Sequence, residues 1–157
     1  MNRRTFQAEL SALVGGTILL PIAACKTPEG PKIDVSTYDI GEVGIASLRA
    51  LIDGQQISIR DLTQLYLNRI QAIDVEGPAL NSIIHVNPKA LERAEQLDKE
   101  LASKKGTSAL YGIPVILKDN TDTSDMPTTA GSRALDGSYP LQDAHITKLL
   151  RLSLIHI

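Results

Sequence analysis

A lysine stands at the end of an apolar run in the second half of the chain. Ile113 to Leu117 is continuously apolar, and Lys118 follows it before a stretch dense in Asp, Thr and Ser. Burial beside apolar neighbours disfavours the charged form of a lysine. A neutral amine can take a proton from a serine hydroxyl and so activate it as a nucleophile. Lys118 is therefore a candidate base, or else it ends a strand in solvent, paired with Asp119 or Asp122.

The apolar run itself predicts the element that positions this lysine. A continuous run without alternation is typical of a strand covered on both faces. Pro114 donates no ladder hydrogen bond, but proline is tolerated near the first residue of a strand. Ligands of open α/β sheets bind at the carboxyl ends of strands, which is where Lys118 stands.

Two helices are expected upstream. From about Val43 apolar residues recur at helical spacing, and Gly54 is a plausible stop. Ser58 with Asp61 three residues later looks like a capping box, and it starts a second helix that runs to about Asp74. The apolar stripe of the first helix is expected to contain Ile45, Leu48, Leu51 and Ile52.

A short strand and a third helix should follow. Ser82 to Val86 is β-branched and predicts a strand, in which His85 is interpreted as structural rather than catalytic. Asn87-Pro88 then starts a helix that Lys104-Lys105-Gly106 closes. The order helix, helix, strand, helix, strand predicts an α/β fold with helices covering a mixed or parallel sheet.

The apolar run belongs to a longer motif. GIPVILKDNTDTSDMPTTAGSRAL, Gly112 to Leu135, resembles the N-terminal signature of the amidase signature family. Residues 48–74 and 80–101 resemble the leading helices and first strand of that family, and Asp143-Ala144 with the helix after it also fits. The resemblance covers about residues 43–151. It implies the N-terminal part of the amidase-signature fold, with helices packed on an incomplete mixed sheet.

The resemblance also implies a site. The family hydrolyses carboxamides, or transfers the amide nitrogen, through a Ser–cis-Ser–Lys triad, and Lys118 matches the lysine. It would take the proton of the nucleophile through the bridging serine. No cofactor or metal is expected, and the substrate would be a small carboxamide. The residues that would shape the pocket are Asp119, Asn120, Thr129, Gly131 and Ser132.

Two-thirds of that triad has no counterpart in the sequence. The Gly-Ser-rich segment that carries both serines should lie several tens of residues beyond Ser132, and no such run occurs. Ser132 belongs to the end of the first motif and is not taken as the nucleophile. We therefore expect an N-terminal fragment of a larger exported amidase, inactive by itself. The alternative is a non-enzymatic exported lipoprotein module derived from an amidase.

Residues 1–24 predict an export signal. Arg3 and Arg4 give a basic start, and the apolar run that follows is too short for the roughly 20 residues of a bilayer crossing. Residues 2–7 resemble a twin-arginine signal, although arginine pairs also occur in signals for the general secretion route. The protein is expected to be exported from a bacterial cytoplasm.

The end of the signal resembles a lipobox. In Ile22-Ala23-Ala24-Cys25 the cysteine would be lipidated, which places the protein in the periplasm or anchors it to a membrane; the alternative is an idle thiol. Residues 25–42 then form a tether and 43–151 a partial amidase domain. Residues 152–157 could pair as a strand but look more like an atypical truncated tail, in which His156 is incidental.

Composition excludes other classes of partner and site. The formal net charge is −2, so nothing favours nucleic acid or an anionic membrane as a partner. One Phe and no Trp provide no stacking platform for single-stranded nucleic acid. The single cysteine excludes an internal disulfide and a multi-cysteine metal site.

Overall fold

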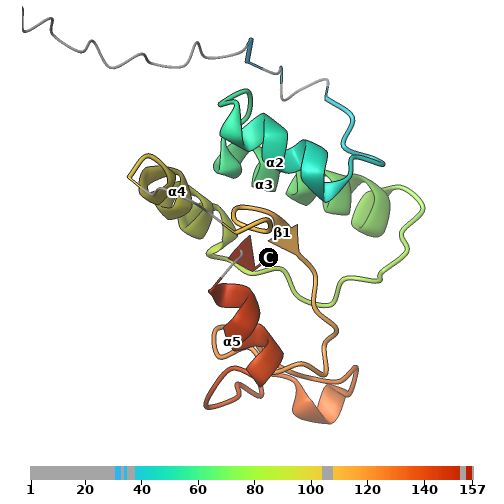
Figure 1. Cartoon of the computed structure of the whole chain (residues 1–157). Coiled ribbons are helices and arrows are strands. Elements are labelled where there is room, and N and C mark those ends of the chain that lie inside the picture. The colour runs from blue at the N-terminus through green and yellow to red at the C-terminus, as the bar shows by residue number, and fades with distance from the viewer. Residues whose placement is uncertain (1–30, 33, 35–37, 104–107, 153–154, 157) are drawn as a thin grey trace, which may run out of the picture.

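The computed structural model describes residues 31–32, 34, 38–103, 108–152 and 155–156. These ranges are largely helical, and α2 and α3 lie on one side of a small strand pair with α5 on the other (Figure 1). The expected signal, Cys25 and the Lys104–Gly106 helix stop lie outside the described residues. The elements are α2 (Ile45–Asp53), α3 (Ile59–Arg69), the π-helical η1 (Ile70–Glu76), α4 (Ala90–Leu101), β1 (Pro114–Val115), the 3-10 turn η2 (Arg133–Leu135), α5 (His145–Arg151) and β2 (Ile155–His156).

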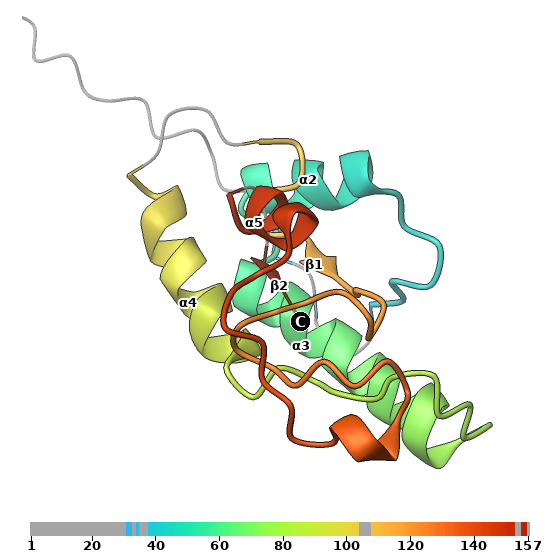
Figure 2. The ribbon, with the colours of Figure 1, turned by 90° about the horizontal axis from the view of Figure 1, so that it is seen from below.

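The hydrophobic core joins α2, α3 and α4 to the segment before β1. Figure 2 shows α4 beside α3, on the flank of the strand pair. Full burial of a Leu or Ile side chain stabilises a fold by about 1.5–3 kcal/mol. Ile45 was expected in this core but is 50 % exposed, so the apolar stripe of α2 is narrower than predicted. The core consists of Ile40, Leu48, Ile52, Ile57, Ile59, Leu62, Leu65, Ala94, Leu97, Tyr111 and Ile113.

The start of α3 confirms the Ser58 half of the predicted capping box and adds a second cap. The Ser58 hydroxyl accepts a hydrogen bond from the Asp61 N–H at 2.9 Å. The Asp98 carboxylate, from α4, accepts from the N–H groups of Ile59 at 2.8 Å and Arg60 at 3.0 Å. These first N–H groups have no partner inside the helix, so a carboxylate there also complements the helix dipole. Asp98 thus docks α4 against the beginning of α3.

The second predicted helix changes character before its end. It is α-helical to Arg69 and π-helical through η1, closing with a hydrogen bond from Gly77 N–H to Ala72 O at 2.9 Å. Asp74 is buried in this turn, and its carboxylate accepts from the N–H groups of Ser82 at 2.7 Å and Ile83 at 3.1 Å. This carboxylate therefore fixes the path of the chain after the helix.

The strand predicted at Ser82 to Val86 is wrong. The segment forms no ladder within the described residues, although its burial alternates as in a strand, with Ile83 and His85 half-buried. A strand needs a neighbouring strand for its hydrogen bonds. Here the first two N–H groups are bound by Asp74 instead, and no described strand lies alongside.

The apolar run that carries Lys118 forms only a short strand. β1 pairs in parallel with β2, Pro114 opposite Ile155 and Val115 opposite His156. Ile113 is buried, but Ile116 is 63 % exposed, so the prediction of a run covered on both faces is wrong at Ile116. The two-stranded sheet provides no layer over that side chain. A larger mixed sheet stays a prediction.

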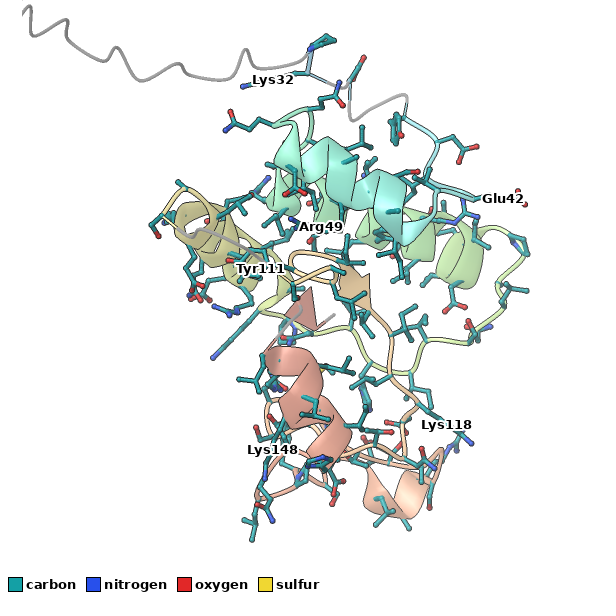
Figure 3. All side chains as sticks on the ribbon, viewed as in Figure 1. Lys32, Glu42, Arg49, Tyr111, Lys118 and Lys148 are labelled. Carbon is teal, nitrogen blue, oxygen red and sulfur yellow. The ribbon has the colours of Figure 1, made fainter. Side chains whose placement is uncertain are left out.

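A buried arginine and a glycine position the chain just before β1. The Arg49 guanidinium donates to Tyr111 O and to the Asp53 carboxylate, and the Tyr111 hydroxyl donates to Leu97 O at 3.1 Å (Figure 3). Gly112 has φ +77°, and a Cβ there would lie 2.8 Å from Ile59 Cδ1. The close approach of this turn to α3 therefore requires glycine.

None of the helices that the structure describes is long and apolar enough to cross a membrane.

Candidate active site

Lys118 lies on the stretch of chain between β1 and η2 (Figure 3). It opens a turn that is closed by a hydrogen bond from Thr121 N–H to Lys118 O at 2.9 Å. Its side chain is exposed, which corrects the expectation of partial burial, because the two-stranded sheet leaves this edge uncovered. The alternative pairing is not found either, since no ion pair among the described residues joins Lys118 to Asp119 or Asp122.

A cavity of about 520 Å³ opens beside this lysine. Four of the predicted site residues line it: Lys118, Asp119, Asn120 and Gly131. Thr129 is buried behind the wall, and Ser132 is exposed and outside the lining. The structure therefore brings four of the six predicted site residues to one cavity and separates Ser132 from it.

Asp119 joins the lysine turn to the loop that follows Pro127. Its carboxylate accepts from Gly131 N–H at 3.1 Å, from Thr129 N–H at 3.4 Å and from the Thr129 hydroxyl. Its carbonyl oxygen accepts from Ala130 N–H at 3.0 Å. Burial raises the pKa of Asp119, but the hydrogen bonds from Thr129 and Gly131 outweigh it and hold that pKa below its usual range.

The loop held by Asp119 has an unusual backbone. Ala130 and Gly131 both have positive φ, +49° and +73°. The left-handed region disfavours residues with a Cβ, so Ala130 adopts a conformation that its surroundings must maintain. The loop is closed on its far side by a hydrogen bond from Ser132 N–H to Thr129 O at 2.8 Å. Glycine adopts such a positive φ without the penalty of a Cβ, and the pocket-shaping role of Gly131 stays a prediction.

His85 lines the same cavity, which sequence reasoning missed. Its Nε2 is buried and has no hydrogen-bond partner among the described residues, and its charge helps to lower the pKa of Asp119. The alternation from Ser82 to Val86 was the available signal, since it places His85 on the same face as Ile83, a second lining residue. The structural reading of His85 stays a prediction.

An ionic network braces the cavity wall that contains Thr123 and Met126. Arg151 of α5 donates to Asp143 through Nε at 2.6 Å and also to the carboxylate of Asp125. Asp143 in turn accepts from Ser124 N–H at 2.7 Å and from its hydroxyl at 2.9 Å. The sequence showed no sign of this network, because its members are separated along the chain.

The contacts within this network also shift the pKa values of Asp143 and Arg151. Burial raises the pKa of Asp143, but hydrogen bonds from Ser124 and Arg151 outweigh it and keep that pKa below its usual range. Burial lowers the pKa of Arg151, yet the bonds to Asp125 and Asp143 raise it further above its ordinary value. Asp143 and Arg151 therefore stay ionised near neutral pH.

The described side chains offer an amine but no metal centre. No three His, Cys, Asp or Glu residues gather as a metal site would require within the ranges that the structure describes. A primary amine on a cavity rim can move a proton. It cannot form an acyl intermediate without a nucleophile.

The comparisons with known proteins agree with the motif. A family model described as Amidase matches residues 61–155, more than half of the chain. A probable amidase of Arabidopsis thaliana is 40 % identical over 121 residues, covering 75 % of this chain and 23 % of that protein. A glutamyl-tRNA(Gln) amidotransferase subunit of Corynebacterium glutamicum is 39 % identical over 125 residues, covering 78 % of this chain and 24 % of the subunit.

Solved structures show the same relationship. Native peptide amidase from Stenotrophomonas maltophilia superposes with a TM-score of 0.71 at 38 % identity, over 74 % of this chain and 24 % of that one. An amidase family protein from Bacillus anthracis gives the same TM-score at 39 % identity, over 75 % and 24 %. The chain thus spans about a quarter of the length of these relatives, and its fold is similar to that of the matching quarter of their chains. This chain belongs to the amidase family.

Proposed function

We propose that the longer protein to which this chain corresponds hydrolyses the carbon–nitrogen bond of linear carboxamides through a Ser–cis-Ser–Lys triad, with Lys118 as its base. The observation that carries the proposal is the place of Lys118. It follows β1 closely, within the matched residues 61–155, on the rim of a cavity that it shares with three other predicted site residues, Asp119, Asn120 and Gly131. Relatives named as amidases, among them the peptide amidase solved with its competitive inhibitor chymostatin, support a small amide as substrate.

Lys118 would serve this reaction by moving one proton. The neutral amine takes a proton from the bridging serine, which takes one from the nucleophilic serine as its oxygen attacks the amide carbon. The proton then returns through the same path to the leaving nitrogen, and the carbon–nitrogen bond breaks. Water repeats the cycle on the acyl-enzyme. No cofactor takes part in the proposed steps.

The proposed reaction requires a further segment of the longer protein to pack against Lys118. The amine of Lys118 is exposed in the described residues, whereas burial is what favours the neutral amine that a base of this kind needs. The segment that brings the two serines must therefore also cover Lys118. The sequence contains no Gly-Ser-rich run that could supply them. We infer that residues 25–157 alone do not turn over amides, because a base without a nucleophile and oxyanion hole forms no acyl-enzyme.

The test is Lys118→Ala in the longer protein, assayed for ammonia release from simple carboxamides. We expect kcat to fall by at least about 10³-fold, because the variant has no group to accept the serine proton. Lys99→Ala is the matched control, since Lys99 lies on α4, outside the lining of the cavity, and should leave turnover unchanged. Full turnover by Lys118→Ala, or serine-reagent-sensitive hydrolysis by residues 25–157, would contradict the proposal.

We also propose export and lipid anchoring at Cys25, which would place the enzyme in the periplasm or at a membrane. The lipobox-like Ile22-Ala23-Ala24-Cys25 supports this. Export separates the protein from aminoacyl-tRNA, which favours hydrolysis over the transfer named for the amidotransferase relatives.

A further inference from the structure

The amine of Lys118 depends on its backbone for its position. No hydrogen bond or ion pair within the described ranges involves its ammonium group. Before Lys118 the chain is held by the buried Ile113 and by β1. After Lys118 the first residue with tertiary contacts is Asp119. Whatever fixes Asp119 therefore limits where the base can lie.

Asp119 is fixed by four hydrogen bonds to three consecutive residues. Its carboxylate accepts from the Thr129 hydroxyl, from Thr129 N–H at 3.4 Å and from Gly131 N–H at 3.1 Å, and its carbonyl accepts from Ala130 N–H at 3.0 Å. We call these four bonds the Asp119 clip. Ala130 and Gly131 line the cavity that Lys118 also lines, so the clip joins the lysine turn to another part of its own cavity wall.

The clip is built from groups that have few alternative partners. Thr129 is only 5 % exposed, so a broken bond would leave its hydroxyl largely without water. Its oxygen also accepts from Gly131 N–H at 3.2 Å, which closes a small ring of bonds around the carboxylate. Charge-assisted bonds of this kind are stronger than neutral ones. They oppose the tendency of Ala130 to leave its left-handed conformation.

We propose that Asp119 is a positioning residue for the base: through Thr129 and Gly131 it holds the backbone of Lys118 at the cavity. The assignment rests on the proposed function, because it gives the lysine a reaction to serve. Asp119 itself moves no proton in this scheme. Its effect is geometric, and misplacing a reacting group by about 1 Å can cost roughly 10²-fold in rate.

Two substitutions at Thr129 separate the bond from the bulk of the side chain. Thr129→Val removes the hydroxyl and keeps the volume, whereas Thr129→Ser keeps the hydroxyl. In the longer protein we expect Thr129→Val to lower kcat about 10- to 100-fold with KM within about 3-fold, and Thr129→Ser to stay near wild type. Asp119→Ala should lose at least as much as Thr129→Val. Asp136→Ala, an exposed carboxylate beyond the loop, should change nothing.

Hydrogen exchange gives a readout that does not require activity. Mass spectrometry of peptides that cover residues 128–132 should show faster amide exchange in Thr129→Val and Asp119→Ala than in Thr129→Ser and Asp136→Ala. Faster exchange with undiminished kcat would overturn the positioning role, and so would equal losses in the Val and Ser variants. If Lys118→Ala also retained turnover, the base itself would be disproved. The exchange data would then still report the clip, so the two failures are distinguishable.

Discussion

At the scale of single residues, buried carboxylates hold the chain where regular structure ends. Asp74 accepts two N–H groups and the hydroxyl of Ser82, so it satisfies backbone groups that have no strand partner. The hydroxyl and N–H of Ser82 lower the pKa of Asp74 most, burial raises it, and the N–H of Ile83 lowers it further. The carboxylate is therefore bound more tightly in its charged form than in its protonated form.

Asp74→Asn should make the free energy of unfolding less dependent on pH in the acid range. A depressed folded-state pKa stabilises the protein fully above the unfolded value of about 3.9, and the contribution disappears as the pH falls through the folded pKa. Urea unfolding should show that the wild type has a larger free energy of unfolding than Asp74→Asn at neutral pH. This difference should shrink as the pH is lowered to about 3. Asp136→Asn, at an exposed carboxylate, serves as control. An advantage that stays constant over this range would refute the explanation.

At the scale of elements, one glycine decides how closely the turn before β1 approaches α3. Gly112→Ala forces a Cβ into the left-handed region and to within 2.8 Å of Ile59, which is fully buried. We expect the free energy of unfolding to fall by about 1–2 kcal/mol for the backbone conformation, and by a further 1–3 kcal/mol, roughly, for the overpacking.

Gly137→Ala separates these two costs. Gly137 has φ +73° but nothing within 4 Å of its ideal Cβ, so only the backbone cost should remain there. Denaturant unfolding of both variants measures the difference. Equal losses at the two positions would show that the contact with Ile59 relaxes without cost.

Elements with local signals could be predicted from the sequence, and elements that depend on distant partners could not. The cap that Ser58 provides to the Asp61 N–H lies within one turn, and this half of the predicted capping box is present. Asp98, which caps the same helix, is 39 residues from Ile59, and spacing alone does not reveal such a pair. The segment of Ser82 had a strand-like composition, but forming a strand depends on a neighbour.

For the site, too, residues within one local motif could be predicted, whereas features that depend on distant parts of the chain could not. The motif marked Lys118, Asp119, Asn120 and Gly131, which line the cavity, but it gave no sign of His85. Burial of Lys118 was inferred from its apolar neighbours and is wrong, since burial depends on what covers the sheet edge. The Asp119 clip could not be predicted, because it depends on the backbone conformation of Ala130. An alanine in a sequence gives no sign that its φ will be positive.

At the scale of the whole molecule, the chain spans about a quarter of the length of its relatives. Its described part contains the proposed base, Lys118, and the loop that Asp119 binds, but neither of these supplies a nucleophile. Protein from this chain alone should therefore fail to hydrolyse amides even if every contact described above forms.

The proposed anchoring predicts a single site of lipid attachment. Cys25 is the only cysteine in the sequence, so Cys25→Ser removes every thiol. We expect a tagged fatty acid to label the wild-type protein in the membrane fraction and to leave the variant unlabelled. Labelling of the variant would place the lipid elsewhere, and an unlabelled wild type would disprove the anchor. Replacing Arg3 and Arg4 by lysine should block export only if the twin-arginine route is used.

The cap that Asp98 provides also sets an order of events during translation. Ile59 leaves the ribosome 39 residues before the carboxylate that will receive its N–H. At about 5–20 residues per second this interval lasts roughly 2–8 s. During that time Ser58 is the only one of the two caps that exists. The two caps of α3 therefore become available at different times, the hydroxyl of Ser58 first and the carboxylate of Asp98 only after α4 has been synthesised.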